Sequence, residues 1–311
     1  MKVLTTGASG FVGQAILQAA KHRGVQVRPV FRSQASANGL PEAVILPGLD
    51  CPADWSKALQ GVDVVIHAAA RTHVMREEAL DPLAEYLRVN MHGTLNLARQ
   101  AATAGVRRFV FISSIKVNGE ETVHSCPFTA YDDPKPEDAY GISKAEAEDG
   151  LRRIAEETGM EVTIIRPPLI YGQGVKGNFA SLIRLVRWGV PLPLGGVTHN
   201  RRSFVGLDNL VDLIFVCIEH PKAANQTFLV SDGEDLSTTE LLKRIGEALR
   251  HPARLVLVPP IAISFMANLL GSKGISQRLL GSLQVDIHKT CDLLQWKPSD
   301  TVDEGLRKAM E

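Results

Sequence analysis

The chain has 311 residues, of which 45% are hydrophobic and 22% charged, a composition typical of a soluble globular protein with one large or two closely joined domains. Lysine plus arginine (34) equals aspartate plus glutamate (34), so no bulk charge attracts nucleic acid or an anionic membrane. The four cysteines are widely spaced in neither a disulfide nor a zinc-binding pattern, and no export signal precedes the first apolar run. We therefore expect a cytoplasmic location, no nucleic-acid partner and no metal.

Short apolar runs alternate with helical patterns through the first half of the chain. Strands are predicted at residues 3–4, 25–30, 62–67, 109–112 and 161–165. Helices are predicted at residues 12–22, 55–59 and 83–104, with a further helix that carries Tyr140. This alternation predicts an α/β fold with a doubly wound parallel sheet of the Rossmann type.

Beyond about residue 170, Gly- and Pro-rich loops mix with short helices and strands. We therefore expect a dinucleotide-binding domain over residues 1–170, which a later strand could rejoin, and a smaller substrate-binding lobe over residues 171–311. The most apolar stretch, residues 255–270, is interrupted by Pro259 and Pro260 and is too short to span a bilayer. It is predicted to be a buried or surface-docking segment, and no transmembrane helix is expected.

A glycine-rich loop, Thr-Gly-Ala-Ser-Gly-Phe-Val-Gly, follows the first predicted strand and opens a helix. Glycines at this point allow a tight turn and a close approach of the backbone to a pyrophosphate, which the amide groups of the helix N-terminus stabilise. The loop residues predicted to bind a dinucleotide are Gly7, Ser9, Gly10, Phe11, Val12 and Gly13.

The second predicted strand ends in Arg32 and Ser33 rather than in an acidic residue. An acid there usually binds the ribose 2′-hydroxyl of NAD, whereas a basic residue suits the 2′-phosphate of NADP. Arg32 and Ser33, with Arg28 as a further candidate, therefore favour NADP, and NAD remains the alternative.

Tyr140 and Lys144 are separated by about one helical turn, so their side chains share one helix face. A positive charge beside a phenol lowers its pKa from the ordinary value of about 10. The pair therefore predicts a tyrosine that exchanges protons near neutral pH, with Lys144 as the group that lowers its pKa.

The order of these motifs resembles that of the extended short-chain dehydrogenase/reductases in the NAD-dependent epimerase/dehydratase family. The motifs that carry the resemblance are the glycine loop, His67-Ala-Ala-Ala70, Asn90-Met-His-Gly-Thr94, Ser113-Ser114, Tyr140-x3-Lys144 and Arg166-Pro167-x3-Tyr171-Gly172. They span nearly the whole chain. The resemblance implies a nucleotide-sugar substrate, held mainly by the second lobe, and a homodimer through the helices at residues 83–104 and 140–154.

Roles carried over from the family make Ser114, Tyr140 and Lys144 the catalytic residues. Ser114 would bind the substrate oxygen, Tyr140 would exchange its proton, and Lys144 would also bind the nicotinamide ribose. The further cofactor contacts that the resemblance implies are Asp50, Ala68, Ala69, Ala70, Asn90, Pro167 and Tyr140 itself. The implied substrate contacts are Ser114, Lys116, Asn178, Phe179, Arg202 and Arg278, of which the arginines suit a sugar diphosphate. Asn118-Gly119 stands where relatives often carry Tyr-Gly, so one sugar contact differs.

The residues after Ser114 distinguish among the reactions of the family. Sugar 4,6-dehydratases place Asp-Glu there, whereas this chain has Ile115-Lys116, which argues against dehydration. Two reactions at sugar C4 remain. Arg32 favours reduction of a UDP-4-keto-6-deoxy-N-acetylhexosamine by NADPH for surface polysaccharides, as in bacterial enzymes that form UDP-N-acetylquinovosamine. The alternative is a UDP-glucose or UDP-N-acetylglucosamine 4-epimerase with bound NAD. A non-catalytic dinucleotide sensor is a third reading, of another class.

Overall fold

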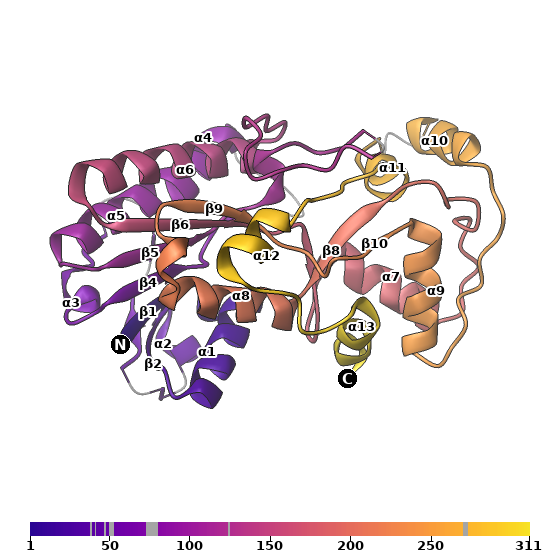
Figure 1. The fold of residues 1–311 in the computed structure, drawn as a ribbon. Coiled ribbons are helices and arrows are strands. Elements are labelled where there is room, and N and C mark those ends of the chain that lie inside the picture. The colour runs from indigo at the N-terminus through magenta and orange to yellow at the C-terminus, as the bar shows by residue number, and fades with distance from the viewer. Residues whose placement is uncertain are drawn as a thin grey trace.

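A seven-stranded parallel sheet forms the larger of two lobes (Figure 1), with strand order β3-β2-β1-β4-β5-β6-β9. The computed structural model describes residues 1–311 apart from 38, 41, 47, 50–52, 73–79, 124 and 270–272, with the backbone alone at 267–269 and 273–276. The strands are β1 (Lys2–Thr6), β2 (Gln26–Phe31), β3 (Val44–Ile45), β4 (Val64–His67), β5 (Arg108–Ile112), β6 (Glu161–Arg166) and β9 (Gln226–Leu229). The predicted doubly wound parallel sheet is confirmed.

Helices cover both faces of this sheet and bury a separate apolar core on each. One face packs against α1 (Phe11–Arg23), α8 (Leu207–Glu219) and α12 (His288–Leu294). The other packs against α3 (Ser56–Leu59), α5 (Gly93–Thr103) and α6 (Ala139–Thr158). Strands that helices cover on both faces have no side exposed to solvent, which explains why β4 and β5 are buried along their whole lengths.

The predicted helix at residues 83–104 is present as a continuous helical run that contains a π-helical turn. It comprises α4 (Pro82–Tyr86), the π-helical turn η1 (Leu87–His92) and α5. A π-helical turn adds a residue to the helical repeat and often occurs at functional sites. Here it contains the buried Asn90. The homodimer expected through α5 and α6 stays a prediction.

The smaller lobe is built around a three-stranded sheet with the order β10-β8-β7. Its strands are β7 (Leu169–Tyr171), β8 (Arg202–Gly206) and β10 (Asp235–Leu236), and its helices are α7 (Gly177–Arg187), α9 (Thr238–Ala248), α10 (Pro260–Leu269), α11 (Lys273–Leu280) and α13 (Val302–Met310). Two residues join β6 to β7, so the carboxyl end of the large sheet leads directly into this lobe (Figure 1).

The remaining short elements are α2 (Gln34–Ala37) and the 3-10 turns η2 (Ile115–Val117) and η3 (Pro221–Ala223). Cys126, Cys217 and Cys291 are free thiols. Within the described part of the chain, no helix is both long and apolar enough to cross a bilayer.

Candidate active site

Ser114, Tyr140 and Lys144 come together at the carboxyl end of the large sheet. Ser114 follows β5, and its hydroxyl accepts a hydrogen bond from the Lys116 amide at 3.3 Å and lies close enough to the phenol of Tyr140 to affect its pKa. Tyr140 lies in the first turn of α6, where the Asp138 carboxylate accepts a hydrogen bond from the Gly141 amide at 2.7 Å. The three predicted catalytic side chains therefore occupy one site.

Lys144 lies one turn after Tyr140 and is buried. Its Nζ donates a hydrogen bond to the Ile112 carbonyl at 2.8 Å and lies 4.3 Å from the centre of the Phe111 ring. Burial lowers the pKa of Lys144 to about 7, and the nearby Glu148 carboxylate opposes that shift. At neutral pH the Lys144 amine is therefore only partly protonated.

The expected lowering of the Tyr140 pKa is wrong for the protein without cofactor. Burial raises the pKa of Tyr140 above its ordinary value, and Asp138 and Tyr86 add to the increase, while the Ser114 hydroxyl opposes it. Desolvation, Asp138 and Tyr86 together disfavour the phenolate more than Ser114 favours it. The sequence shows that Lys144 is near, but it does not show how deeply the pair is buried.

The glycine loop lies against the backbone that follows β4. Gly7 has φ 69°, and a Cβ atom there would lie 2.7 Å from the Ala69 nitrogen. A Cβ on Gly13 would lie 2.0 Å from the Gly7 carbonyl oxygen, so only glycine allows α1 to approach the turn. Gly10 is the N-cap residue of α1 and has no side chain to cap the helix, which leaves the first amides of the helix for an anion. Ser9 is exposed, and Phe11 and Val12 are half-buried. This loop fits a dinucleotide pyrophosphate.

A buried hydrogen-bonded chain positions residues 68–71, which include Ala68, Ala69 and Ala70, all half-buried. Thr94 donates its hydroxyl proton to the Asn90 carbonyl at 2.6 Å, so His67 must donate from Nε2 to Thr94 and accept from Thr6 at Nδ1. The Asn90 amide group also bonds both main-chain groups of Arg71 and the Ser143 hydroxyl. Asn90 therefore joins the cofactor side of the site to α6.

Replacing His67 should change the acid sensitivity of the protein. Burial lowers the pKa of His67 from 6.5 to about 3. Between these two pH values the unfolded chain binds a proton at His67 and the folded chain does not. The stability from this group is present above pH 6.5 and is lost as the pH falls towards 3, with a slope of about 1.4 kcal/mol per pH unit. Denaturant unfolding of His67→Gln between pH 6 and pH 4 should show a slope smaller by about that amount.

His22→Gln, at the exposed end of α1, is the matched control. Equal slopes for His67→Gln and the wild-type protein would show that His67 is protonated in the fold. Among the described residues, no group of three or more His, Cys, Asp or Glu side chains could hold a metal ion.

Arg32 and Ser33 are exposed directly after β2. Arg28 is not available to them: its guanidinium donates to the carbonyls of Ala58, in α3, and Gln60, directly after it, at 2.6 and 2.8 Å. We therefore withdraw Arg28 as a candidate for the 2′-phosphate. Asp50, the predicted adenine contact, lies outside the described residues.

A buried ion pair beneath the site was missed in the sequence. Arg166, at the end of β6, donates from Nε and Nη2 to the two carboxylate oxygens of Glu148 at 2.9 and 2.6 Å. Glu148 also accepts from the Ser113 hydroxyl at 2.6 Å, and Arg166 Nη1 donates to the side chain of Asn118 at 2.8 Å. Glu148 lies four residues after Lys144 on the same face of α6, a spacing that could have indicated its role.

The predicted substrate residues divide between the rim of the site and the protein interior. Lys116 pairs with Glu120 and Asp138 at 2.6 and 2.5 Å. Arg202 donates to the Gly281 carbonyl at 3.1 Å and interacts electrostatically with Glu121, Glu120 and Arg278, so Lys116 and both predicted arginines belong to one charged cluster. Burial lowers the pKa of Arg202, and the two glutamates oppose that shift.

The position of Phe179 corrects the prediction that its side chain binds substrate. Phe179 is 3% exposed and stacks on Tyr171 with ring centres 5.5 Å apart, so we assign its side chain to the core of the smaller lobe rather than to substrate. Asn178, at the start of α7, is exposed. Pro167 is buried, and its carbonyl accepts from the Ile115 amide at 3.0 Å, which holds the Ser114 loop beside β6.

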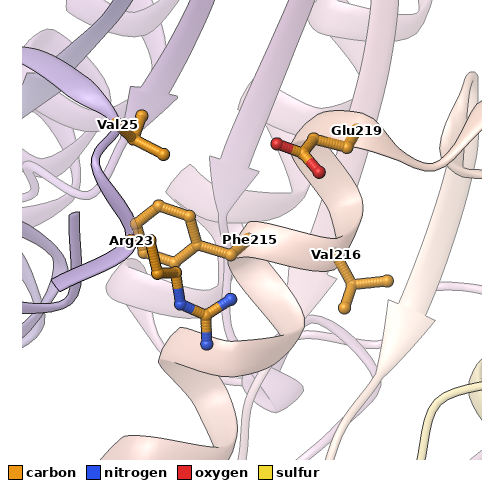
Figure 2. A pocket seen from close by; sticks show the side chains of 5 residues that line it. All are labelled: Arg23, Val25, Phe215, Val216 and Glu219. Carbon is orange, nitrogen blue, oxygen red and sulfur yellow. The ribbon is translucent and has the colours of Figure 1, made fainter.

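A hollow of about 260 Å³ lies elsewhere, between the end of α1 and α8 (Figure 2). It is lined by Arg23, Val25, Phe215, Val216 and Glu219. Val25 directly precedes β2, so the hollow lies at the amino ends of the strands, whereas ligands of such sheets bind at the carboxyl ends. It is not part of the candidate active site.

Known proteins resemble the chain over almost its full length. A UDP-glucose 4-epimerase of Vibrio cholerae is 47% identical over 311 residues, which cover 99% of this chain and 94% of the relative. An N-acetyl-α-D-glucosaminyl-diphospho-ditrans,octacis-undecaprenol 4-epimerase of Escherichia coli O157:H7 is 27% identical and covers 86% and 77%. The crystal structure of UDP-N-acetylglucosamine 4-epimerase from Bacillus cereus shares the fold, with a TM-score of 0.81 and 20% identity over 99% of this chain and 97% of that one.

The family model described as "NAD dependent epimerase/dehydratase family" matches residues 3–231, which include the glycine loop and the Ser114, Tyr140 and Lys144 site. The match confirms the family that the order of motifs predicted. The chain belongs to the NAD dependent epimerase/dehydratase family, as an enzyme of the extended short-chain dehydrogenase/reductase type.

Proposed function

We propose that the protein transfers hydride at C4 of a UDP-sugar, and that its reaction is the 4-epimerisation of a UDP-hexose. The observation that carries this proposal is that Ser114 and Tyr140 lie together, with Lys144 one turn away, beside a glycine loop that fits a dinucleotide. The 47% identity to a UDP-glucose 4-epimerase favours epimerisation within this chemistry.

Tyr140 is the acid/base of the proposed mechanism. Oxidation of a C4 alcohol removes a hydride and a proton together, and Tyr140 takes the proton while Ser114 holds the same oxygen. The nicotinamide of NAD supplies the hydride acceptor and, when oxidised, a positive charge. Because burial raises the Tyr140 pKa in the protein alone, Tyr140 depends on nearby positive charge, which a protonated Lys144 adds, to release its proton at neutral pH.

The charged cluster at Lys116, Arg202 and Arg278 is the proposed site of the UDP diphosphate. Arginine binds phosphate oxygens through two donors at once, and a partly buried guanidinium binds more strongly than an exposed one. Glu120 and Glu121 balance these cations in the structure, so a diphosphate must compete with them. We expect binding of the UDP moiety to weaken as salt concentration rises.

The direct test is to release and identify the nucleotide carried by the purified protein, and to assay it with UDP-glucose and UDP-N-acetylglucosamine. Retained NAD and interconversion of either sugar with its C4 epimer would support the proposal. Turnover of a UDP-4-keto sugar with added NADPH, without epimerisation, would replace it by the reductase. Failure of both reactions would favour the dinucleotide sensor.

Reduction of a UDP-4-keto-6-deoxy-N-acetylhexosamine by NADPH is the second candidate, and Arg32 favours it. The side chain is exposed at the end of β2, where no acid stands to bind a 2′-hydroxyl. Arg32→Ala should weaken NADPH by about 10- to 100-fold, the equivalent of one hydrogen bond to a charged group, and NADH much less. Titration of cofactor fluorescence measures both affinities, with Arg99→Ala, exposed on α5, as the control. Equal losses would remove the argument for NADP.

A further inference from the structure

α10 and the segment before it lie at the outer edge of the smaller lobe (Figure 1). They carry an exposed apolar surface. Leu257 is 83%, Ile261 84% and Phe265 63% exposed. With the exposed Val256 and Met266, these residues form what we call the α10 surface. Ile261 and Phe265 are four residues apart and share one helix face, whereas Ile263 packs into the lobe core.

The backbone of this surface is held in place by neighbouring elements. The Val256 amide donates to the Leu192 carbonyl and the Val256 carbonyl accepts from the Gly195 amide, at 2.8 and 3.0 Å. The helix that follows packs against α11. The apolar side chains are therefore presented outward by an ordered scaffold.

The surface lies in a markedly basic part of an otherwise balanced chain. Between Glu247 and Asp286 the sequence contains no acidic residue, but it contains Arg250, Arg254, Lys273 and Arg278. These 38 residues thus carry four positive charges and no negative ones, while the whole chain has 34 of each. Arg250, Arg254 and Arg278 are exposed. The equal numbers of positive and negative residues in the whole chain led us to expect no attraction to an anionic membrane. That total does not reveal the positive charge of this segment.

Exposed apolar side chains on a segment whose charges are all positive match the interface of an anionic bilayer. Large apolar groups enter the boundary between head groups and acyl chains, and arginines pair with the lipid phosphates. A second copy of the chain fits less well, since a two-fold contact would bring together two segments of the same positive charge. The helix has ten residues, too few to span a bilayer, so it would lie in the interface.

We propose that the α10 surface docks the protein on anionic phospholipid membranes. The charged cluster of the candidate site would then face the region near the bilayer, because α11 carries Arg278 and packs against α10. This inference stands apart from the proposed function, since the α10 surface holds none of the catalytic residues and its test leaves Arg278, a member of the charged cluster, unchanged.

Flotation of the full-length protein with vesicles tests the proposal. Vesicles of phosphatidylethanolamine and phosphatidylglycerol should carry the protein at low salt and lose it as salt rises, whereas pure phosphatidylcholine vesicles should carry much less. The triple variant Leu257→Ser, Ile261→Ser, Phe265→Ser should reduce the bound fraction by roughly tenfold or more, since burying one large apolar side chain is worth about a factor of ten. Arg250→Gln with Arg254→Gln should weaken binding to the anionic vesicles selectively.

Leu80→Ser, Val123→Ser, Tyr131→Ser removes three exposed apolar side chains elsewhere and serves as the matched control. Unfolding temperatures, which should match the wild type, show that each variant folds. The proposal is overturned if the wild type does not float with anionic vesicles, or if the α10 variant floats as well as the control. It is also overturned if light scattering shows that the α10 variant only converts a dimer to a monomer, because the surface would then be a subunit interface.

Discussion

Replacement of Tyr140 by phenylalanine is expected to lower kcat by about 10²–10⁴-fold, the contribution of a positioned general acid or base. The substitution removes only the hydroxyl that lies near Ser114, and the ring retains its edge contact with the Tyr86 ring, whose centre lies 6.2 Å away. Cofactor affinity should therefore change little. Steady-state turnover of the UDP-sugar and titration of the cofactor measure the two effects separately.

Tyr131→Phe is the matched control, because Tyr131 is exposed and lies outside the site. Ser114→Ala should also lower kcat, since it removes a donor to the reacting oxygen. If Tyr140→Phe turned over at nearly the normal rate, another group would have to carry the proton and the mechanism would be wrong. That result would not count against the glycine loop as a cofactor site, because Tyr140 is not part of the loop.

Replacement of Glu148 by alanine is expected to reduce the free energy of unfolding by about 3–5 kcal/mol, the cost of removing one partner of a buried ion pair. Both side chains of the Glu148–Arg166 pair are almost wholly inaccessible to solvent. The variant would leave the Arg166 guanidinium buried without its carboxylate. Denaturant unfolding at neutral pH measures the loss, and catalysis should fall with it because Ser113 and Asn118 bond the same pair.

Glu146→Ala is the control on the same helix, because Glu146 is exposed and its replacement should have little effect on stability. The double variant Glu148→Leu, Arg166→Met should be more stable than Glu148→Ala, since removing both charges leaves neither one unpaired. Equal stability of Glu148→Ala and Glu146→Ala would show that the pair contributes nothing to the fold.

The large sheet was predictable because its strands are read directly from the sequence. Runs such as Val64-Val65-Ile66 and Phe109-Val110-Phe111 are covered on both faces and therefore carry no polar residues, which distinguishes them from the helices between them. The π-helical turn at Leu87–His92 was not predictable, because the apolar pattern of the helix continues through it and only the backbone hydrogen bonds change.

The site was predictable where its residues form local motifs. The glycine loop, Ser114 and the Tyr140–Lys144 pair each occupy a short segment whose spacing has a chemical meaning. The Glu148–Arg166 pair joins a helix to a strand, and the sequence does not show that the two side chains meet. The direction of the Tyr140 shift likewise depends on burial, which is a property of the assembled fold.

The course of the chain between the two lobes limits how the protein could be divided by genetic engineering. After β6 it enters the smaller lobe, returns for α8 and β9, leaves again at β10, returns for α12 and ends in α13 beside β7 and β8. A fragment ending at residue 170 would lack α8, whose apolar residues cover one face of the sheet. Exchange of sugar specificity between relatives would therefore require several junctions, and it is better attempted by substitutions at the rim of the site.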